Sequence, residues 1–288
     1  MIPAAFEYAR PSNIGEALDA LAAGGGAAKV LAGGQSLLPL MRLRLAHCDT
    51  LVDISELAEL RAIRELPDGG LGIGALATYR DVLDSDLATS RVPLLAIVIP
   101  GIGDVQVRNR GTLGGSIAHA DPASDMPAVA LALDAQIALR SRSGERVVAA
   151  GDFFEGAFAT DLAEDELLTE IRIPAQPAGA GMAYHSLEQR ASGYSIVGVA
   201  AVVGRSGGAV TAAKIGITGV GDVAYRASAV ESALIGTPGD AAAITAAAAH
   251  AADGVTVNSD IHADATYRAE MARVETRRAI EAALAAGE

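Results

Sequence analysis

Tryptophan is absent from this 288-residue chain, and cysteine occurs once, at Cys48. One cysteine cannot form a disulfide within the chain, and an iron–sulfur cluster normally takes four cysteine ligands, so the chain alone cannot hold such a cluster. With four Phe and six Tyr, few rings are available for nucleic-acid bases to stack on. The formal net charge of −13 also opposes binding to phosphates. We therefore expect no nucleic-acid partner.

The usual signs of a metal site or a membrane segment are missing as well. The five histidines show no HExxH or paired metal spacing, and no window reaches about 18 continuous apolar residues. Glu7 lies where a signal peptide would be apolar. We expect a cytoplasmic protein with no transmembrane segment, which would reach the inner face of a membrane only through a partner.

The most informative stretch is a turn rich in glycine and small residues at 111–116. Its glycines let a ligand approach the backbone, because no Cβ stands in the way. Converging backbone N–H groups bind anions, and a diphosphate is a frequent occupant of such a turn. Taken alone, a glycine pair of this kind is more often a tight structural turn than a binding site. The candidate binding residues are Gly111, Thr112, Gly114, Gly115 and Ser116.

A second loop of the same type comes earlier in the chain. A short apolar strand is predicted at 29–32, and it runs directly into Gly33 and Gly34. A strand that feeds a glycine-rich turn is where βα proteins bind phosphates, although no Gly-Lys-Ser/Thr follows, which excludes a P-loop. Together the two loops would grip both phosphates of a dinucleotide. The residues of this first loop are Lys29, Val30, Leu31, Ala32, Gly33, Gly34, Gln35, Ser36 and Leu37.

Asp125 follows the second loop and allows two interpretations. It is either the N-cap of a helix over 126–133 or a carboxylate that accepts hydrogen bonds from a ribityl or ribose chain. Elsewhere, Gly72-x-Gly74-x-x-Ala77 imitates a nicotinamide dinucleotide fingerprint, but no acidic residue ends a second strand about 20 positions later. No nucleophile–base pair or carboxylate dyad stands out, so the chemistry would be that of a bound cofactor.

The predicted elements divide the chain into three parts: 1–55, 56–176 and 177–288. The first part has a helix at 12–23 with Ser12 as its N-cap, and strands at 29–32 and 51–54. The second has a capping box at Thr78 and Asp81. Its other expected elements are strands at 71–75 and 167–173, a helix or strand at 93–99, and a hairpin at 136–149.

A proline- and glycine-rich stretch at 174–181 predicts the boundary of the third part. In the last helix we expect Tyr267, Met271 and Val274 to share one face, with the arginines outside. The expected elements of this part are antiparallel strands at 182–187, 196–204 and 210–218 and helices at 227–235, 240–252 and 265–286.

Two segments resemble the flavin-binding motifs of one family. They are AGGQSLLPLMRLRLA at 32–46 and VRNRGTLGGSIAHADPASDMPA at 107–128. The family comprises the FAD-binding medium subunits of molybdenum hydroxylases of the aerobic carbon monoxide dehydrogenase and xanthine dehydrogenase type. The likeness extends to 165–174 and 266–280, and so covers nearly the whole chain. It implies an α+β fold: a vanillyl-alcohol-oxidase (PCMH)-type FAD-binding fold of two α/β subdomains, then a C-terminal domain of antiparallel sheet and helices.

The resemblance also implies where FAD would bind. Its diphosphate would lie on the two loops, and Asp125 matches the ribityl-binding residue of the family. Ile102 and Leu168 match positions beside the flavin ring or on the adenine side, and Tyr194 matches an aromatic side chain that shields the isoalloxazine. Gln35 stands where carbon monoxide dehydrogenases proper typically have His, which leaves the substrate open.

The mechanism implied by the resemblance is electron relay. A large partner subunit with molybdopterin cytosine dinucleotide would hydroxylate the substrate, and a small subunit would pass electrons through [2Fe–2S] clusters to FAD in this chain. FAD would then reduce a quinone, a cytochrome or another acceptor. The expected assembly is a heterohexamer, a dimer of heterotrimers. The alternatives are a stand-alone FAD oxidase or reductase of the same superfamily, and a scaffold without flavin.

Overall fold

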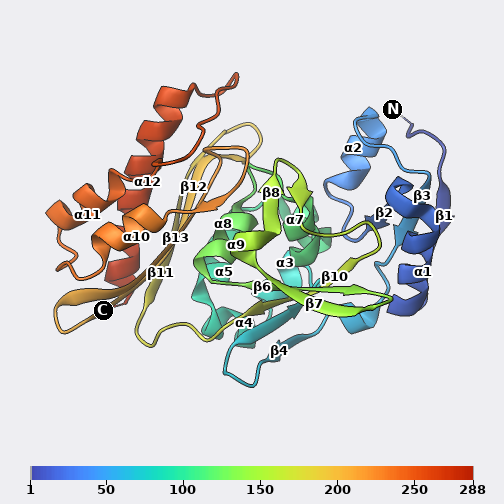
Figure 1. Cartoon of the computed structure of the whole chain (residues 1–288), viewed down its shortest axis with the longest axis horizontal. Coiled ribbons are helices and arrows are strands. Elements are labelled where there is room, and N and C mark those ends of the chain that lie inside the picture. Colours follow the sequence, from blue (N-terminus) through green and yellow to red (C-terminus); the bar gives the residue numbers. More distant parts are fainter. Residues whose placement is uncertain (1, 288) are drawn as a thin grey trace.

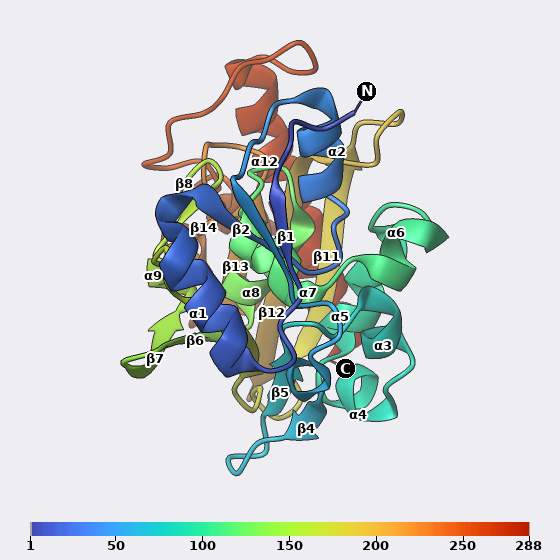
Figure 2. The same ribbon diagram turned by 90° about the vertical axis from the view of Figure 1, so that its right-hand side faces the viewer.

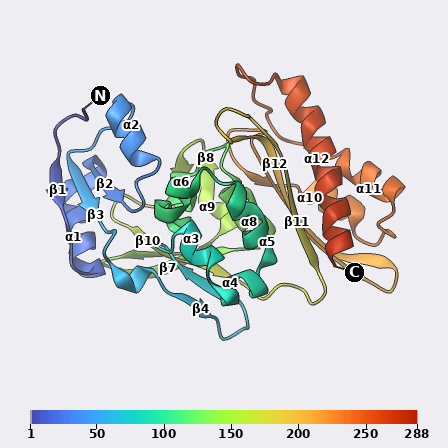
Figure 3. The ribbon, with the colours of Figure 1, turned by 180° about the vertical axis from the view of Figure 1, so that it is seen from behind.

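The computed structural model describes residues 2–287 and arranges its three larger sheets in a row (Figure 1). The N-terminal sheet lies at one end, a middle part with a five-stranded sheet follows, and the C-terminal sheet and helices lie at the other end. The view from behind shows the same order (Figure 3). Within residues 2–287, no helix is long and apolar enough to cross a membrane.

The first sheet is parallel, with the strand order β1-β3-β2. Viewed from the N-terminal end of the molecule, it lies in front of the central helices (Figure 2). The elements of this part are β1 (Glu7–Ala9), α1 (Ile14–Gly24), η1 (Gly25–Ala27), β2 (Ala28–Leu31), α2 (Leu37–Leu43) and β3 (Thr50–Asp53), and the short helix η2 (Ala58–Leu60) follows at the start of the second part.

Helix α1 buries Ile14, Leu18 and Leu21 against this sheet, as its periodicity predicts. Its N-cap is Asn13, whose side chain accepts a hydrogen bond from the backbone of Glu16. The prediction of Ser12 as the cap was wrong by one position. Ser12 instead donates from its backbone N and from Oγ to the Glu16 carboxylate, at 2.8 and 2.9 Å.

The middle sheet is antiparallel throughout, with the order β4-β5-β10-β6-β7. The capping box of Thr78 and Asp81 is present at the start of α3, and the segment that begins at Pro93 is a helix. The strands are β4 (Ile63–Glu65), β5 (Leu71–Gly74), β6 (Gln136–Ser141), β7 (Gly144–Ala149) and β10 (Leu167–Ile173), and a separate pair is β8 (Phe154–Gly156) with β9 (Ala159–Thr160). The helices are α3 (Tyr79–Leu83), α4 (Asp86–Arg91), α5 (Pro93–Val98), η3 (Ile99–Gly101), α6 (Val105–Arg110), α7 (Leu113–His119), α8 (Asp125–Ala132) and α9 (Ala150–Phe153).

The C-terminal sheet is also antiparallel, and helices cover both of its faces. Helix α12 packs on one face, and α8 packs on the other (Figure 1). The approach of α8 requires Gly216 on β13, because a Cβ there would overlap the backbone carbonyl of Ala128. The elements are β11 (Gly181–Glu188), β12 (Ser195–Ser206), β13 (Ala209–Thr218), β14 (Tyr225–Arg226), α10 (Ser228–Leu234), α11 (Ala241–Ala248) and α12 (Ala265–Ala286). The predicted α+β fold is therefore confirmed.

Helix α12 buries a different face from the one we predicted. Tyr267 is 46% exposed, and Met271 and Val274 are only half-buried. The buried face mixes small apolar residues with polar ones, so the spacing of large apolar residues does not identify it. Its buried members are Arg268, Ala272, Glu275, Thr276, Ala279, Ile280, Ala283 and Leu284.

Arg268 ties three segments of the C-terminal part together. Its Nη1 donates to the carbonyl oxygens of Ile196 and Gly219 at 2.7 and 2.6 Å, and its Nη2 to the Asp260 carboxylate at 2.5 Å. The side chain is only 5% exposed, so the charge depends on these partners. Burial alone would raise the pKa of Asp260, but hydrogen bonds from His262, Ala263 and Arg268 hold it below its ordinary value.

We expect Arg268→Met to lower the free energy of unfolding by about 3 kcal/mol, because it leaves two carbonyls and a carboxylate without their donor. Arg277→Met, which removes a half-exposed pair with Glu281, should cost less than about 1 kcal/mol.

Because the pKa of Asp260 is lowered by folding, its pair with Arg268 contributes stability above the ordinary carboxyl pKa and loses it as pH falls through the lowered value. Denaturant titrations at neutral and acid pH should therefore show the Arg268→Met deficit shrinking in acid. A deficit that does not change with pH would contradict this account.

Candidate functional site

The two glycine-containing loops, far apart in the sequence, touch each other in the structure. Gly33 of the first loop packs directly on the second. A Cβ at Gly33 would overlap the carbonyl oxygen of Arg110 and would lie 2.9 Å from the Cα of Gly111. Gly115 faces Ala32, since a Cβ at Gly115 would lie 3.9 Å from the Ala32 Cβ. The loops therefore form one continuous surface between the first sheet and the middle part.

The first loop has the predicted strand and glycine turn, and a short helix follows them. Strand β2 ends at Leu31, and helix α2 begins at Leu37. Gly34 has a φ of 74°, in the left-handed region that favours glycine. The side chain of Gln35 donates to the Gly33 carbonyl at 3.2 Å, which holds the turn closed. The backbone N–H groups at the start of α2 lie at a helix N-terminus, where negative charge is favoured. Lys29 and Val30 lie on β2, before the turn.

The second loop is the first turn of helix α7 rather than an open loop. Thr112 is the N-cap, and its Oγ1 accepts from the Gly115 N–H at 3.1 Å. The N–H groups of Leu113 and Gly114 donate to the carbonyls of Ala77 and Ala75, at 3.0 and 3.1 Å. The donors that the sequence led us to expect at this turn are thus used inside the chain.

Gly114 is required by packing on the middle sheet. A Cβ at this position would lie 2.6 Å from the Ala75 Cβ, just beyond the end of β5. The close approach explains the glycine without a ligand. What the second loop offers to a ligand is the half-buried surface of Gly115 and Ser116.

Asp125 does not cap α8, so that interpretation was wrong. It is the first residue of the helix, and the N-cap position belongs to Ser124. Its Oδ1 accepts from the hydroxyl of Tyr184 and, at 2.7 Å, from that of Ser195. Burial raises the pKa of Asp125, and these two hydrogen bonds oppose the rise. Burial also raises the pKa of Tyr184 well above its usual value, so Tyr184 remains a donor at neutral pH.

Hydroxyl groups connect the second loop to Asp125. The Ser116 Oγ lies 3.1 Å from the Ser124 Oγ, and Ser124 directly precedes Asp125. Beneath them Tyr79 is buried. Burial raises its pKa, and a hydrogen bond with Ser116 lowers it in part. No sequence pattern pointed to Tyr184 or Ser195, because they come from β11 and β12 of the third part, and only the folded chain brings them to Asp125.

The remaining predicted positions differ in exposure. Tyr194 is 47% exposed on the segment between β11 and β12. Ile102 is half-buried, and its carbonyl accepts from Arg108 at 3.0 Å. Leu168 is 4% exposed and belongs to the core of the middle part. Its side chain packs inside the protein and is not part of the surface beside the two loops.

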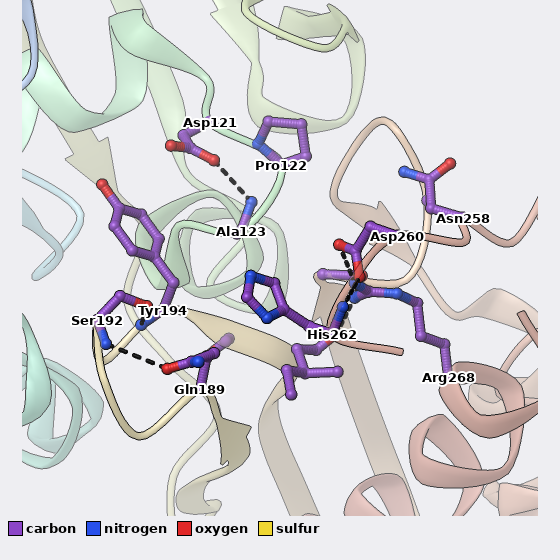
Figure 4. Close-up of a pocket in the computed structure, with 14 residues that line it drawn as sticks. Asp121, Pro122, Ala123, Gln189, Ser192, Tyr194, Asn258, Asp260, His262 and Arg268 are labelled. Atoms are coloured by element: carbon purple, nitrogen blue, oxygen red, sulfur yellow. Dashed lines mark hydrogen bonds and ion pairs between the residues drawn. The ribbon is translucent and has the colours of Figure 1, made fainter. Parts of the chain in front are cut away.

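A cavity of about 300 Å³ lies beside Tyr194 (Figure 4). Asp121 comes from the segment before α8, and Asp260 and His262 come from the segment that leads into α12. The cavity adjoins the Asp125 cluster, because Ser195 belongs to both. Among residues 2–287, no group of three or more His, Cys, Asp or Glu side chains could hold a metal ion.

Two family models together match nearly the whole chain. The model of the FAD binding domain in molybdopterin dehydrogenase matches residues 4–176. The model of the CO dehydrogenase flavoprotein C-terminal domain matches residues 182–283.

Individual relatives agree with these matches. The carbon monoxide dehydrogenase medium chain of Hydrogenophaga pseudoflava is 41% identical over 99% of both chains. The glyceraldehyde dehydrogenase medium chain of Sulfolobus acidocaldarius is 39% identical over 98% of this chain and 99% of its own. A solved carbon monoxide dehydrogenase from Hydrogenophaga pseudoflava, which lacks the Mo-pyranopterin moiety of its cofactor, superposes with a TM-score of 0.96 at 43% identity over 99% of both chains. The chain therefore belongs to the carbon monoxide dehydrogenase-type family of FAD-binding medium subunits, which are components of molybdenum-containing oxidoreductases.

Proposed function

We propose that this chain binds FAD along the surface from the two loops to Tyr194 and relays electrons as the medium subunit of a molybdenum hydroxylase. The observation that carries the proposal is the contact of Gly33 with the second loop, next to the hydroxyl-bonded Asp125. Such a surface offers backbone donors at one end and a carboxylate at the other. These are the groups that a diphosphate and a polyol chain require.

The residues present fit FAD with one change from the sequence-based expectation. The N–H groups at the turn before α2 would hold the diphosphate, because those of Leu113 and Gly114 are used inside the chain. Asp125 would accept from the ribityl hydroxyls, and Tyr184 and Ser195 orient its carboxylate. Half-exposed Tyr194 would cover the ring. Bound FAD supplies the redox chemistry, and this chain binds, orients and shields it.

The electrons would come from partner subunits. A small subunit with [2Fe–2S] clusters would supply them, since this chain has a single cysteine, which is buried. A large subunit with molybdopterin cytosine dinucleotide would oxidise the substrate, and the assembly would be a dimer of heterotrimers in the cytoplasm. Relatives of similar identity are named for carbon monoxide and for glyceraldehyde. Sequence identity between medium subunits therefore does not identify the substrate, which the large subunit would bind.

The three sheets support a division of the chain into parts 1–55, 56–176 and 177–288. We propose these as two FAD-binding subdomains and a C-terminal domain. The core of the first part also takes in Leu57, Leu60, Leu76 and Leu167 of the second part, so the two proposed subdomains share a packed boundary. The FAD surface would lie along that boundary.

Purification of the protein from its native host tests the proposal as a whole. We expect flavin and iron–sulfur absorbance and two further co-purifying chains. A yellow protein without other chains would favour a stand-alone flavoenzyme. A colourless chain that takes up no added FAD, alone or with its partners, would overturn the proposal.

We expect Gly33→Ala to reduce flavin retention strongly, because the new Cβ must push the two loops apart. Gly151→Ala is the matched control, since a Cβ there meets nothing within 4 Å. Both variants are compared by flavin absorbance per chain and by circular dichroism, which reports the fold. Normal flavin content in a folded Gly33→Ala protein would contradict the loop assignment.

Asp125→Asn should weaken FAD binding by about 1–3 kcal/mol, because a charged hydrogen bond becomes a neutral one.

The same substitution should increase the folding stability of the flavin-free protein at neutral pH. Folding raises the pKa of Asp125, so this carboxyl favours the folded state below its ordinary pKa and loses that contribution as pH rises through the raised value. Asn removes the buried charge, so the variant should gain stability relative to wild type at neutral pH and not at acid pH. Isothermal titration with FAD and melting curves across pH measure the two effects, and equal FAD affinity would refute the ribityl role.

A further inference from the structure

Strand β13 holds helix α8 at three points along its length. Thr218 bonds to the carbonyls just before the helix, and Gly216 lies under its middle. Lys214 pairs with Asp134, just beyond the end of the helix. These alternate strand residues share one face and extend over about 13 Å, which matches the length of about 12 Å of the eight-residue helix. The strand therefore supports α8 from one end to the other.

Asp134 is an unexpected residue at the end of α8. Its φ is 51°, in the left-handed region where a glycine or an asparagine usually ends a helix. A carboxylate is also disfavoured at a helix C-terminus, because that end of the helix dipole is negative. Neither the backbone nor the dipole accounts for an aspartate here, so the reason lies in the partners of its side chain.

Two cations from the C-terminal sheet hold this carboxylate. The Lys214 Nζ lies 2.7 Å from the Asp134 Oδ2, and the Arg226 Nη1 pairs with Oδ1. Arg226 also donates to the Leu131 carbonyl in the last turn of α8, at 3.2 Å, and pairs with Glu231. Burial would raise the pKa of Asp134, but hydrogen bonds from Lys214 and Arg226 hold it below its ordinary value, so the carboxylate is charged at neutral pH.

We propose that Asp134, Lys214 and Arg226 form a positioning cluster that sets flavin affinity from the far end of α8. The inference rests on the proposed function, in which the carboxylate of Asp125 accepts hydrogen bonds from the ribityl chain. Helix α8 is buried from Met126 to its end and packs as one rigid body, so a shift at its C-terminus moves its first residue as well. The cluster fixes the helix along β13, and thereby fixes Asp125 relative to the hydroxyls that β11 and β12 supply.

Matched substitutions can separate this role from a general loss of stability. Asp134→Asn removes the charge and keeps a residue that tolerates the left-handed backbone. Its control is Glu145→Gln on β7, because both side chains are 44% exposed and each pairs with an arginine that keeps a second carboxylate. Lys214→Met removes a cation from the cluster, and Lys214→Arg retains one.

The variants are made in the native complex, from which FAD is removed. Isothermal titration then measures the dissociation constant of added FAD, and the melting temperature of the flavin-free complex reports the stability of the fold. Asp134→Asn is also combined with Asp125→Ala, which removes the side chain through which the cluster acts.

We expect Asp134→Asn to raise the FAD dissociation constant about fivefold, an ordinary size for coupling between distant parts of a protein. Lys214→Met should act in the same way, whereas Lys214→Arg and Glu145→Gln should bind FAD as wild type does. In the Asp125→Ala background, Asp134→Asn should have no further effect on FAD binding, because sites that act through one group are not additive.

Unchanged FAD affinity in Asp134→Asn, an equal loss in Glu145→Gln, or a loss that persists in full with Asp125→Ala would each overturn the proposal. A cluster that only stabilises the fold would lower the melting temperature and leave FAD affinity as in wild type. A wild-type complex that takes up no FAD, or Asp125→Ala without any loss of FAD affinity, would instead refute the proposed function, so the two failures are distinguishable.

Discussion

The packing of helix α8 between the middle part and the C-terminal sheet is the constraint on which the site depends. Every residue from Met126 to Ala132 is buried, so the helix has no solvent face. Its first residue, Asp125, is therefore fixed in position and direction. Thr218 at the end of β13 donates to the carbonyls of Pro122 and Ser124, which ties the segment before the helix to the C-terminal sheet. Because the sheet that holds this segment also supplies Tyr184 and Ser195, the carboxylate is positioned by two parts of the protein at once.

Two charged side chains shape this region, the buried Arg268 and the half-buried Asp125, and each is balanced differently. Arg268 is bound by one carboxylate and two carbonyls, so its charge is compensated within the protein. Asp125 has two hydroxyl donors, and no cation is among the groups that shift its pKa, so burial raises that pKa. A carboxylate whose environment disfavours its charged form does not stabilise the fold. Such a group is expected at a site where it binds a ligand. This contrast is a physical reason, independent of any relative, to place a polyol chain at Asp125.

The mixed origin of the site also explains why sequence analysis found some of it and missed the rest. The first loop was visible because an apolar strand runs directly into a pair of glycines. The second loop was found as well, but its N–H groups were expected to face a ligand. Whether the N–H of Gly114 meets a ligand or the carbonyl of Ala75 depends on how close β5 passes, and no local pattern encodes that distance. The buried face of α12 was missed for a related reason, since Arg268 and Glu275 become interior residues only through partners elsewhere in the chain.

The sequence by itself indicated many of the strands and helices, the cap of α3 and the two glycine loops, and its resemblance to known flavin-binding motifs indicated the family. The strands, helices, cap and loops depend on residues close together in the chain, where backbone sterics and hydrogen-bonding options are local. Only the tertiary structure decided that Gly33 meets Arg110, that Tyr184 and Ser195 hold Asp125, and that a cavity opens beside Tyr194. Such contacts join segments that are far apart in sequence, and they follow from how three sheets pack together. Many of the individual elements were thus predictable from local physics, whereas the chemistry of the surface required the packed fold.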